Sequence, residues 1–136
     1  MVQIDMTYEG KLRCAATHEP SGATLLTDAP KDNMGEGQSF SPTDLVATAL
    51  GTCMLTTMGI VAQRNNIDMR GSTASVLKEM VTAPTRRLGK LTVRITVPTP
   101  LTPDQQDRLR QAALHCPVHK SLHPDVQLPV EFKFGM

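Results

Sequence analysis

Hydrophobic and polar residues alternate near the N-terminus, and this pattern predicts short strands. The alternation covers residues 2–8 and 12–18, which predicts two strands that turn at Glu9-Gly10. Residues 23–27 are a candidate third strand. Residues 28–38 are rich in Gly, Pro, Asn and Asp, which is typical of an exposed loop.

The longest apolar run predicts a helix of about six turns that ends at the polar residues 63–66. Its start signal is Ser41-Pro42-Thr43-Asp44. Ser41 can cap the helix, Pro42 suits the first helical position, and Asp44 falls where a capping-box carboxylate reaches back. Apolar residues lie on most sides of this helix and only small residues interrupt them, so we expect it to be buried on most sides.

The second half of the chain predicts a hairpin, a helix, a short helical turn and a last strand. Thr102-Pro103-Asp104-Gln105 repeats the helix start signal, and Pro117 forces a break because the residue before a proline avoids the helical region. The expected elements are strands at 72–80 and 90–97 joined by a turn at 84–89, a helix from 102 to about 115, a short helical turn at 118–122, and a strand at 130–134. This order is that of an α+β fold, and we expect a single domain over residues 1–136.

Composition narrows the functional classes. The 14 basic and 13 acidic side chains nearly cancel, so the net charge of +1 gives no reason to expect nucleic acid or an anionic membrane as a partner. No run approaches the roughly 18 apolar residues of a membrane span, and residues 1–8 do not resemble a signal peptide. We therefore expect a cytoplasmic protein, in which three cysteines point to redox or nucleophilic chemistry rather than structural disulfides.

The chain has few aromatic side chains from which to build a core. Aromatic residues make up 3% of the chain, whereas eight methionines are present. A short chain with so few aromatic residues to bury is expected to rely on a partner subunit for part of its buried area.

Two cysteines are candidates for chemistry. Cys53 lies near the centre of the long helix, where it is either a small buried hydrophobe or a nucleophile that is activated from across the fold, because no adjacent residue supplies a cation. Cys116-Pro117 can place a sulfur at the cap of the following helical turn, where amide N–H groups and the nearby His115, His119 and Lys120 would favour the thiolate. Alternatively, Cys116 ends a helix and packs inward. Local features alone favour Cys116 as the more activated thiol.

Other sites have little support. His115, Cys116, His119 and His123 invite a metal site, but Pro117 interrupts the helix and no second ligand pair lies elsewhere, so we expect no metal. The glycines at 35 and 37 do not follow a strand and predict no nucleotide site. Cys14, in a predicted strand, is interpreted as structural.

Three motifs together resemble the OsmC/Ohr superfamily, which is named for osmotically inducible protein C and organic hydroperoxide resistance protein. They are Ser41-Pro42-Thr43-Asp44-Leu45, Leu50-Gly51-Thr52-Cys53 and His115-Cys116-Pro117-Val118, and the turn at 86–90 before the strand at 93–97 fits as well. The similarity extends over nearly the whole chain, and the pair of a helix cysteine and a distant Cys-Pro is far more specific than either cysteine alone.

The resemblance implies antiparallel sheets packed around a long central helix, in two chains that intertwine as a homodimer with active sites at the subunit interface. It also implies a thiol-dependent peroxidase of the oxidative stress response, with peroxiredoxin-type chemistry and no cofactor. Cys53 would be the peroxidatic cysteine and Cys116 the resolving one. Organic hydroperoxides would be reduced to alcohols, and an external dithiol would reduce the resulting disulfide.

The chain departs from the family pattern at one position. In the best-characterised hydroperoxide reductases, a glutamate follows the proline at the helix start and orients a catalytic arginine. Here that residue is Thr43, and the carboxylate comes one residue later, at Asp44, as in less-studied OsmC-like members. One residue rotates a helical side chain by about 100°. Asp44 and Arg13 are therefore interpreted only as supporting residues.

Two further expectations concern what the thiols do. The apolar neighbours of Cys53 (Leu50, Met54 and Met58) suggest a preference for organic peroxides over hydrogen peroxide. A competing interpretation is a non-catalytic OsmC-like domain that senses redox state or binds a ligand. In a third, purely structural interpretation, both cysteines are inert.

Overall fold

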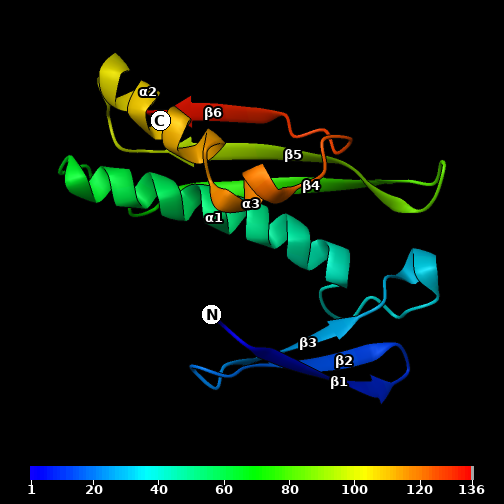
Figure 1. Cartoon of the computed structure of the whole chain (residues 1–136). Coiled ribbons are helices and arrows are strands. Elements are labelled where there is room, and N and C mark those ends of the chain that lie inside the picture. Colours follow the sequence, from blue (N-terminus) through cyan, green and yellow to red (C-terminus); the bar gives the residue numbers. More distant parts are fainter. Residues whose placement is uncertain (136) are drawn as a thin grey trace. The chain divides into compact units, whose positions relative to one another are not determined.

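The computed structural model describes residues 1–135 and confirms the predicted α+β class (Figure 1). In this described part, the strands form two three-stranded sheets, with orders β1-β2-β3 and β4-β5-β6. Residues 1–46 form one compact unit and the residues from Ala47 onward form another.

The first unit is built on an antiparallel sheet of β1 (Ile4–Gly10), β2 (Arg13–His18) and β3 (Thr24–Asp28). All three strands lie within two residues of their predicted ranges. The first turn comes later than predicted, at Lys11 and Leu12, which adopt positive φ angles of 57° and 62°. The loop after β3 contains a single 3-10 turn, η1 (Lys31–Asn33).

One face of this first sheet is apolar and exposed. The strand register brings alternate side chains of β1 to the same face as Leu25 of β3. We call Ile4, Met6, Tyr8 and Leu25 the N-terminal apolar face; each of them is at least 44% exposed. Within residues 1–135, every buried hydrophobic side chain lies at Ala47 or beyond. The first unit therefore has no apolar core of its own.

The long helix, α1 (Pro42–Arg64), begins where the start signal predicts. The backbone N–H of Ser41 donates to Asp44 Oδ2 at 2.9 Å, and the N–H of Asp44 donates to Ser41 Oγ at 3.1 Å. This is the reciprocal pair of a capping box, which satisfies N–H groups that the first helical turn leaves unpaired.

The expectation that α1 is buried on most sides is wrong for a single chain. Its fully buried residues form one stripe, made of Ala47, Leu50, Gly51, Met54, Met58 and Ala62. The opposite side is an exposed stripe made of Thr48, Thr52, Thr56 and Ile60. Thr52 and Thr56 turn their hydroxyls inward and donate to the carbonyls of Thr48 and Thr52, at 2.8 and 2.7 Å. Because apolar and small residues occur on all sides of α1, the sequence did not indicate which side packs against the rest of the same chain.

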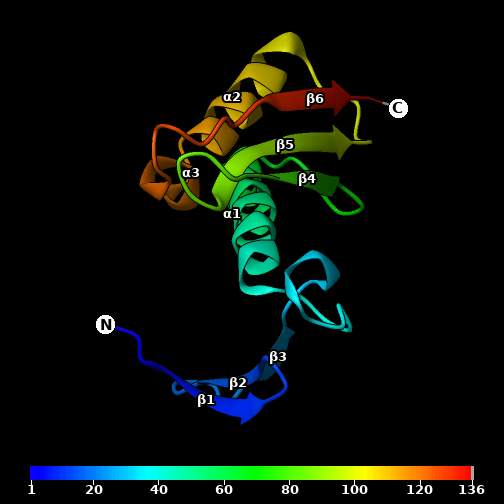
Figure 2. The same ribbon diagram turned by 90° about the vertical axis from the view of Figure 1, so that its right-hand side faces the viewer.

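The second unit places α1 and α2 (Pro103–Leu114) on the same face of its sheet (Figure 2). The sheet consists of β4 (Thr73–Val81), β5 (Arg87–Val97) and β6 (Val130–Phe134), with β4–β5 antiparallel and β5–β6 parallel. The short α3 (Pro117–Ser121) follows α2. The hairpin, both helices and the last strand were predicted, although β5 begins three residues earlier than the pattern indicated.

The core of this unit joins the buried stripe of α1 to the inner face of the sheet. Leu50, Met54 and Met58 are fully buried, as are Leu91 and Val93 of β5. At Gly51 the helix comes so close to β4 that an added Cβ would lie 3.1 Å from Cγ2 of Val76. Glycine therefore allows the close approach of α1 to β4 at this point, where a larger residue would require Val76 to shift.

Length and hydropathy alone would allow α1 to cross a membrane, because its most apolar 18-residue window has a mean hydropathy of 1.8. This corrects the expectation that no segment approaches such a span. The core helix of a globular unit meets the same criterion, and the buried stripe of α1 packs against its own sheet.

Candidate active site

Cys53 is carried by the middle of α1. Its side chain is half-buried and lies on the flank of the helix, between the buried stripe and the exposed stripe. The helix thus fixes the direction of the sulfur while leaving part of it accessible to small molecules.

Cys116 is the N-cap of α3, as the Cys-Pro pair predicts. Its sulfur accepts a hydrogen bond from the backbone N–H of His119 at 3.3 Å, and Pro117 occupies the first helical position. Unlike Cys53, Cys116 is fully buried, with 0% of its surface exposed.

The fold brings these two thiols close enough to interact electrostatically, although they are 63 positions apart (116 − 53) in the sequence. Cys53 is one of the neighbouring groups that act on the titration of Cys116. Both cysteines are free thiols in this structure.

The predicted activation of Cys116 is only partly present. The amide donors are in place, and the N–H groups of His119 and Val118 lower the pKa of the thiol. Burial outweighs them and raises the pKa of Cys116 above its ordinary value of 9.0, and the neighbouring Cys53 raises it further. The prediction that its surroundings favour the Cys116 thiolate is therefore wrong in direction, because burial cannot be seen in the local sequence.

His119 supplies less positive charge near Cys116 than the sequence suggested. Burial lowers the pKa of the His119 imidazole, and the positive charges of Lys120 and His115 lower it further. At neutral pH, His119 is therefore mainly uncharged. Among residues 1–135, no three side chains of His, Cys, Asp or Glu gather as a metal site requires.

Thr57 connects the two helices beside the thiols, a role that sequence reasoning missed. It lies one turn after Cys53, and its hydroxyl is 3.1 Å from the carbonyl oxygen of Ala112 on α2. The same hydroxyl lies 3.1 and 3.0 Å from the carbonyls of Cys53 and Met54. No local signal distinguishes this threonine from the others on the helix.

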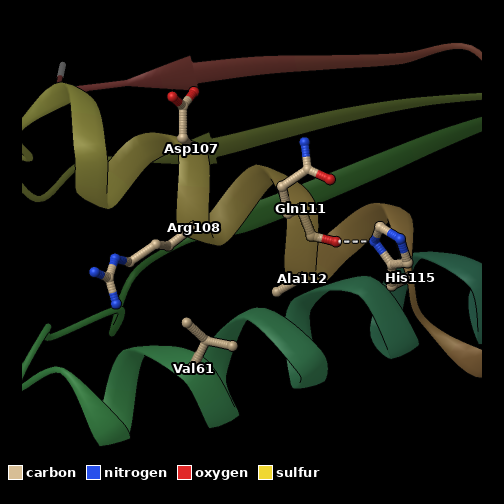
Figure 3. A pocket seen from close by; sticks show the side chains of 6 residues that line it. All are labelled: Val61, Asp107, Arg108, Gln111, Ala112 and His115. Carbon is tan, nitrogen blue, oxygen red and sulfur yellow. Dashed lines mark hydrogen bonds between the residues drawn. The ribbon is translucent and has the colours of Figure 1, made fainter.

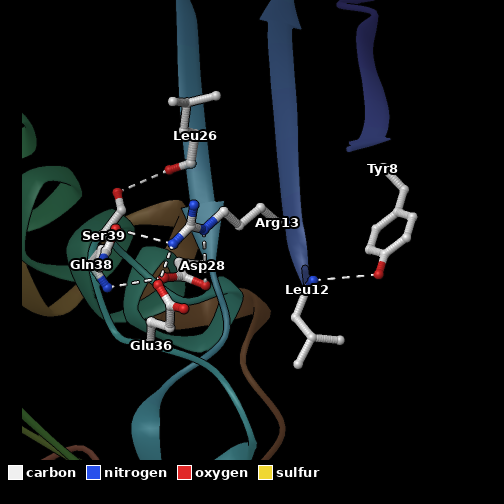
Figure 4. A network of polar contacts seen from close by, with 8 residues as sticks. All are labelled: Tyr8, Leu12, Arg13, Leu26, Asp28, Glu36, Gln38 and Ser39. Atoms are coloured by element: carbon white, nitrogen blue, oxygen red, sulfur yellow. Dashed lines mark hydrogen bonds and ion pairs between the residues drawn. The ribbon is translucent and has the colours of Figure 1, made fainter. Parts of the chain in front are cut away.

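Arg13 and Asp44 both belong to the first unit, and each has a defined partner there. Asp44 serves the capping box of α1. The Arg13 guanidinium donates to Glu36 Oε2 at 2.7 Å and to Gln38 Oε1 at 3.0 Å (Figure 4). Its Nε also lies 3.6 Å from Oδ1 of the buried Asp28. Sequence analysis did not single out these partners of Arg13.

A cavity of ≈ 480 Å³ opens between α1 and α2 (Figure 3). Its lining consists of Val61, Asp107, Arg108, Gln111, Ala112 and His115. The His115 ring nitrogen Nδ1 is 2.7 Å from the carbonyl oxygen of Gln111, and neither cysteine lines the cavity.

Comparisons with known proteins point to one family. The sequence model of the OsmC-like protein family matches residues 35–131. A solved structure from Psychrobacter arcticus 273-4, named as a candidate osmotic stress induced and detoxification response protein, is 45% identical. That similarity covers 97% of this chain and 96% of the other, with a TM-score of 0.92.

More distant structures share the fold. The OsmC-like protein from Mycoplasma pneumoniae is 15% identical, covers 100% of this chain and 98% of its own, and has a TM-score of 0.83. The organic hydroperoxide resistance protein OhrB of Bacillus subtilis is 19% identical, with 98% of each chain covered and a TM-score of 0.71. A comparison with curated proteins found no match.

Proposed function

Because this chain belongs to the OsmC-like protein family, we propose that it is a thiol-dependent hydroperoxide reductase with Cys53 as the peroxidatic and Cys116 as the resolving cysteine. The observation that carries this proposal is that the fold places the two thiols within interaction range of each other, with Cys53 on α1 and Cys116 at the start of α3. Two cysteines that the fold brings together are the pair that a disulfide of about 2.05 Å requires. Some structural relatives are named organic hydroperoxide resistance proteins, which supports the same reaction class.

The reaction proceeds in two steps on the protein. The Cys53 thiolate attacks the distal peroxide oxygen, so that an S–O bond forms, the O–O bond breaks, and the alkoxide leaves as an alcohol after it takes a proton. Cys53 is then a sulfenic acid. The Cys116 sulfur attacks the Cys53 sulfur, the S–S bond forms, and hydroxide leaves as water with the proton from Cys116. An external dithiol then supplies two electrons to restore both thiols.

Exposure supports this division of roles. Peroxide must reach the sulfur that it oxidises, and Cys53 is the more accessible of the pair. Cys116 is shielded from solvent but lies within interaction range of Cys53, which suits a thiol that reacts only with its neighbour.

The preference for organic peroxides rests on the names of relatives rather than on the residues first considered. Leu50, Met54 and Met58 were interpreted as apolar neighbours of the reacting peroxide. All three are 0% exposed and pack in the core, so they are not available to contact a substrate in this chain.

We propose that the chain works as a homodimer. The N-terminal apolar face and the exposed stripe of α1 leave apolar surface uncovered in a single chain, and a second copy would cover it. Arg13 and Asp44 are proposed only as supporting residues, since Asp44 caps α1 and Arg13 is held by Asp28 and Glu36.

A charge in the exposed stripe should disrupt this dimer. We expect Ile60→Lys, at a side chain that is 46% exposed, to shift the protein from dimer to monomer in sedimentation velocity. Leu77→Lys, at 64% exposure on β4, is the matched control and should leave the dimer intact. A wild-type protein that sediments as a monomer at all concentrations would overturn the dimer.

The catalytic proposal is tested by counting thiols. Mixing the reduced protein with cumene hydroperoxide should consume two thiols in the wild type and in Cys14→Ser, and none in Cys53→Ser on the same timescale. If wild type and Cys53→Ser lose thiols at the same rate, Cys53 is not the nucleophile.

The competing function is that of a non-catalytic redox sensor or ligand-binding domain. The residue that favours it is Thr43, which stands where the best-characterised hydroperoxide reductases of the family have a glutamate. Steady-state turnover separates the two, because an enzyme cycles with a dithiol reductant whereas a sensor oxidises once. Turnover that stops after one equivalent of peroxide in the presence of dithiothreitol would favour the sensor.

A further inference from the structure

The two sulfurs of the expected disulfide differ in accessibility. Cys116 is fully buried, whereas Cys53 is half-buried on the flank of α1. In thiol–disulfide exchange, the incoming thiolate must touch the sulfur that it attacks, and the other sulfur leaves. The difference in accessibility therefore determines which of two mixed disulfides can form.

We propose that an external thiol reduces the Cys53–Cys116 disulfide by attacking Cys53, so that Cys116 is the leaving sulfur. This inference rests on the proposed function. In the step, a new S–S bond forms between the reductant and Cys53, the Cys53–Cys116 bond breaks, and Cys116 leaves with the electron pair and then takes a proton. A second thiol of the reductant then displaces Cys53, so the dithiol is oxidised by two electrons and both cysteines are reduced.

The surroundings of Cys116 support its role as leaving group. As the S–S bond breaks, negative charge develops on its sulfur, and the backbone N–H of His119 already points at that atom from 3.3 Å. The N–H of Val118 also favours the charged form. Burial opposes the charge, so these donors offset only part of its cost, and accessibility remains the deciding factor.

Closing the disulfide should not expose Cys116. The thiols already lie within interaction range, and Thr57, one turn after Cys53, connects α1 to the carbonyl of Ala112 on α2. Cys116 is also fixed at its backbone, between the end of α2 and Pro117 of α3. The burial of Cys116 in the thiol form is therefore expected to persist in the disulfide form.

The test identifies the mixed disulfide directly. Cys14→Ser protein is oxidised with diamide, which forms the disulfide without peroxide, and is then mixed with glutathione. The reaction is quenched with acid after successive short times, and the remaining thiols are alkylated under denaturing conditions. Peptide mass spectrometry then locates the glutathione adduct. The freed Cys116 thiol can attack the Cys53–glutathione adduct and restore the original disulfide, so the adduct stays scarce. The ratio of the Cys53 adduct to the Cys116 adduct is therefore measured, rather than the yield of either.

We expect the adduct on Cys53 to exceed that on Cys116 by at least about tenfold. A ratio near one, or an excess on Cys116, would overturn the inference while leaving the peroxidase proposal intact. If diamide forms the disulfide but cumene hydroperoxide does not, the peroxidase proposal fails and the adduct ratio still tests the inference. Failure of diamide to form the disulfide would overturn both.

Single-cysteine variants give an independent measurement in the same Cys14→Ser background. Cys116→Ser leaves only Cys53, and Cys53→Ser leaves only Cys116. With oxidised glutathione, we expect the Cys53 thiol to form its mixed disulfide at least about tenfold faster than the Cys116 thiol. Circular dichroism under the same conditions verifies that both variants are folded. Equal rates in folded variants would contradict the inference.

Discussion

Replacing Cys116 by serine should reduce steady-state turnover of organic hydroperoxide at least about 100-fold, while the first oxidation of Cys53 proceeds normally. Without the second sulfur, the Cys53 sulfenic acid cannot close to a disulfide, and excess peroxide oxidises it irreversibly to the sulfinic acid. The fold should tolerate this change, because the serine oxygen can accept the His119 N–H as a helix cap.

Mass spectrometry distinguishes the states of Cys53 in this variant. Dimedone should trap a sulfenic acid on Cys53 of Cys116→Ser at one equivalent of peroxide, and a sulfinic acid should appear with excess peroxide. Wild type should instead show a disulfide, and Cys14→Ser should behave like wild type. A Cys116→Ser protein that turns over at the wild-type rate with limiting dithiol would show that Cys116 does not resolve the intermediate.

Leu50→Ala should lower the free energy of unfolding by about 3 kcal/mol. Leu50 is fully buried in the core, with 0% of its surface exposed to solvent. The truncation therefore removes buried apolar contacts and leaves a cavity. Chemical denaturation measures the change, at equal protein concentration because the proposed dimer would also contribute to stability.

Leu77→Ala is the matched control, because it makes the same chemical change at a side chain that is 64% exposed on β4. It should change the unfolding free energy by less than about 0.5 kcal/mol. Equal effects of the two substitutions would contradict the assignment of Leu50 to the core. If Leu50→Ala changed kcat/KM for bulky peroxides without changing stability, Leu50 would contact substrate as first interpreted.

The secondary structure was largely predictable because its signals are local. The caps of α1 and α2 each depend on a residue and its third neighbour, Ser41 with Asp44 and Thr102 with Gln105. Both pairs lie within one helical turn, so the spacing of the two residues in the sequence is enough to predict each capping box.

The features that depend on tertiary packing were less predictable. The proximity of Cys53 and Cys116 follows from no local pattern, and only the family resemblance suggested it. The pKa of Cys116 was predicted in the wrong direction, because its amide donors follow from Cys-Pro whereas its burial depends on α1 and α2. The partners of Arg13 come from β3 and from a loop over 20 residues away, so no local spacing indicated them.

The inward-turned hydroxyls of Thr52 and Thr56 affect how α1 can meet another surface. Hydropathy scales count threonine as polar, yet each of these two side chains already has its hydroxyl donor satisfied by a carbonyl of its own helix. Removing water from this side of α1 would therefore leave neither of these two hydroxyl hydrogens without a partner. A surface that covered them would need to supply no acceptor for either hydrogen.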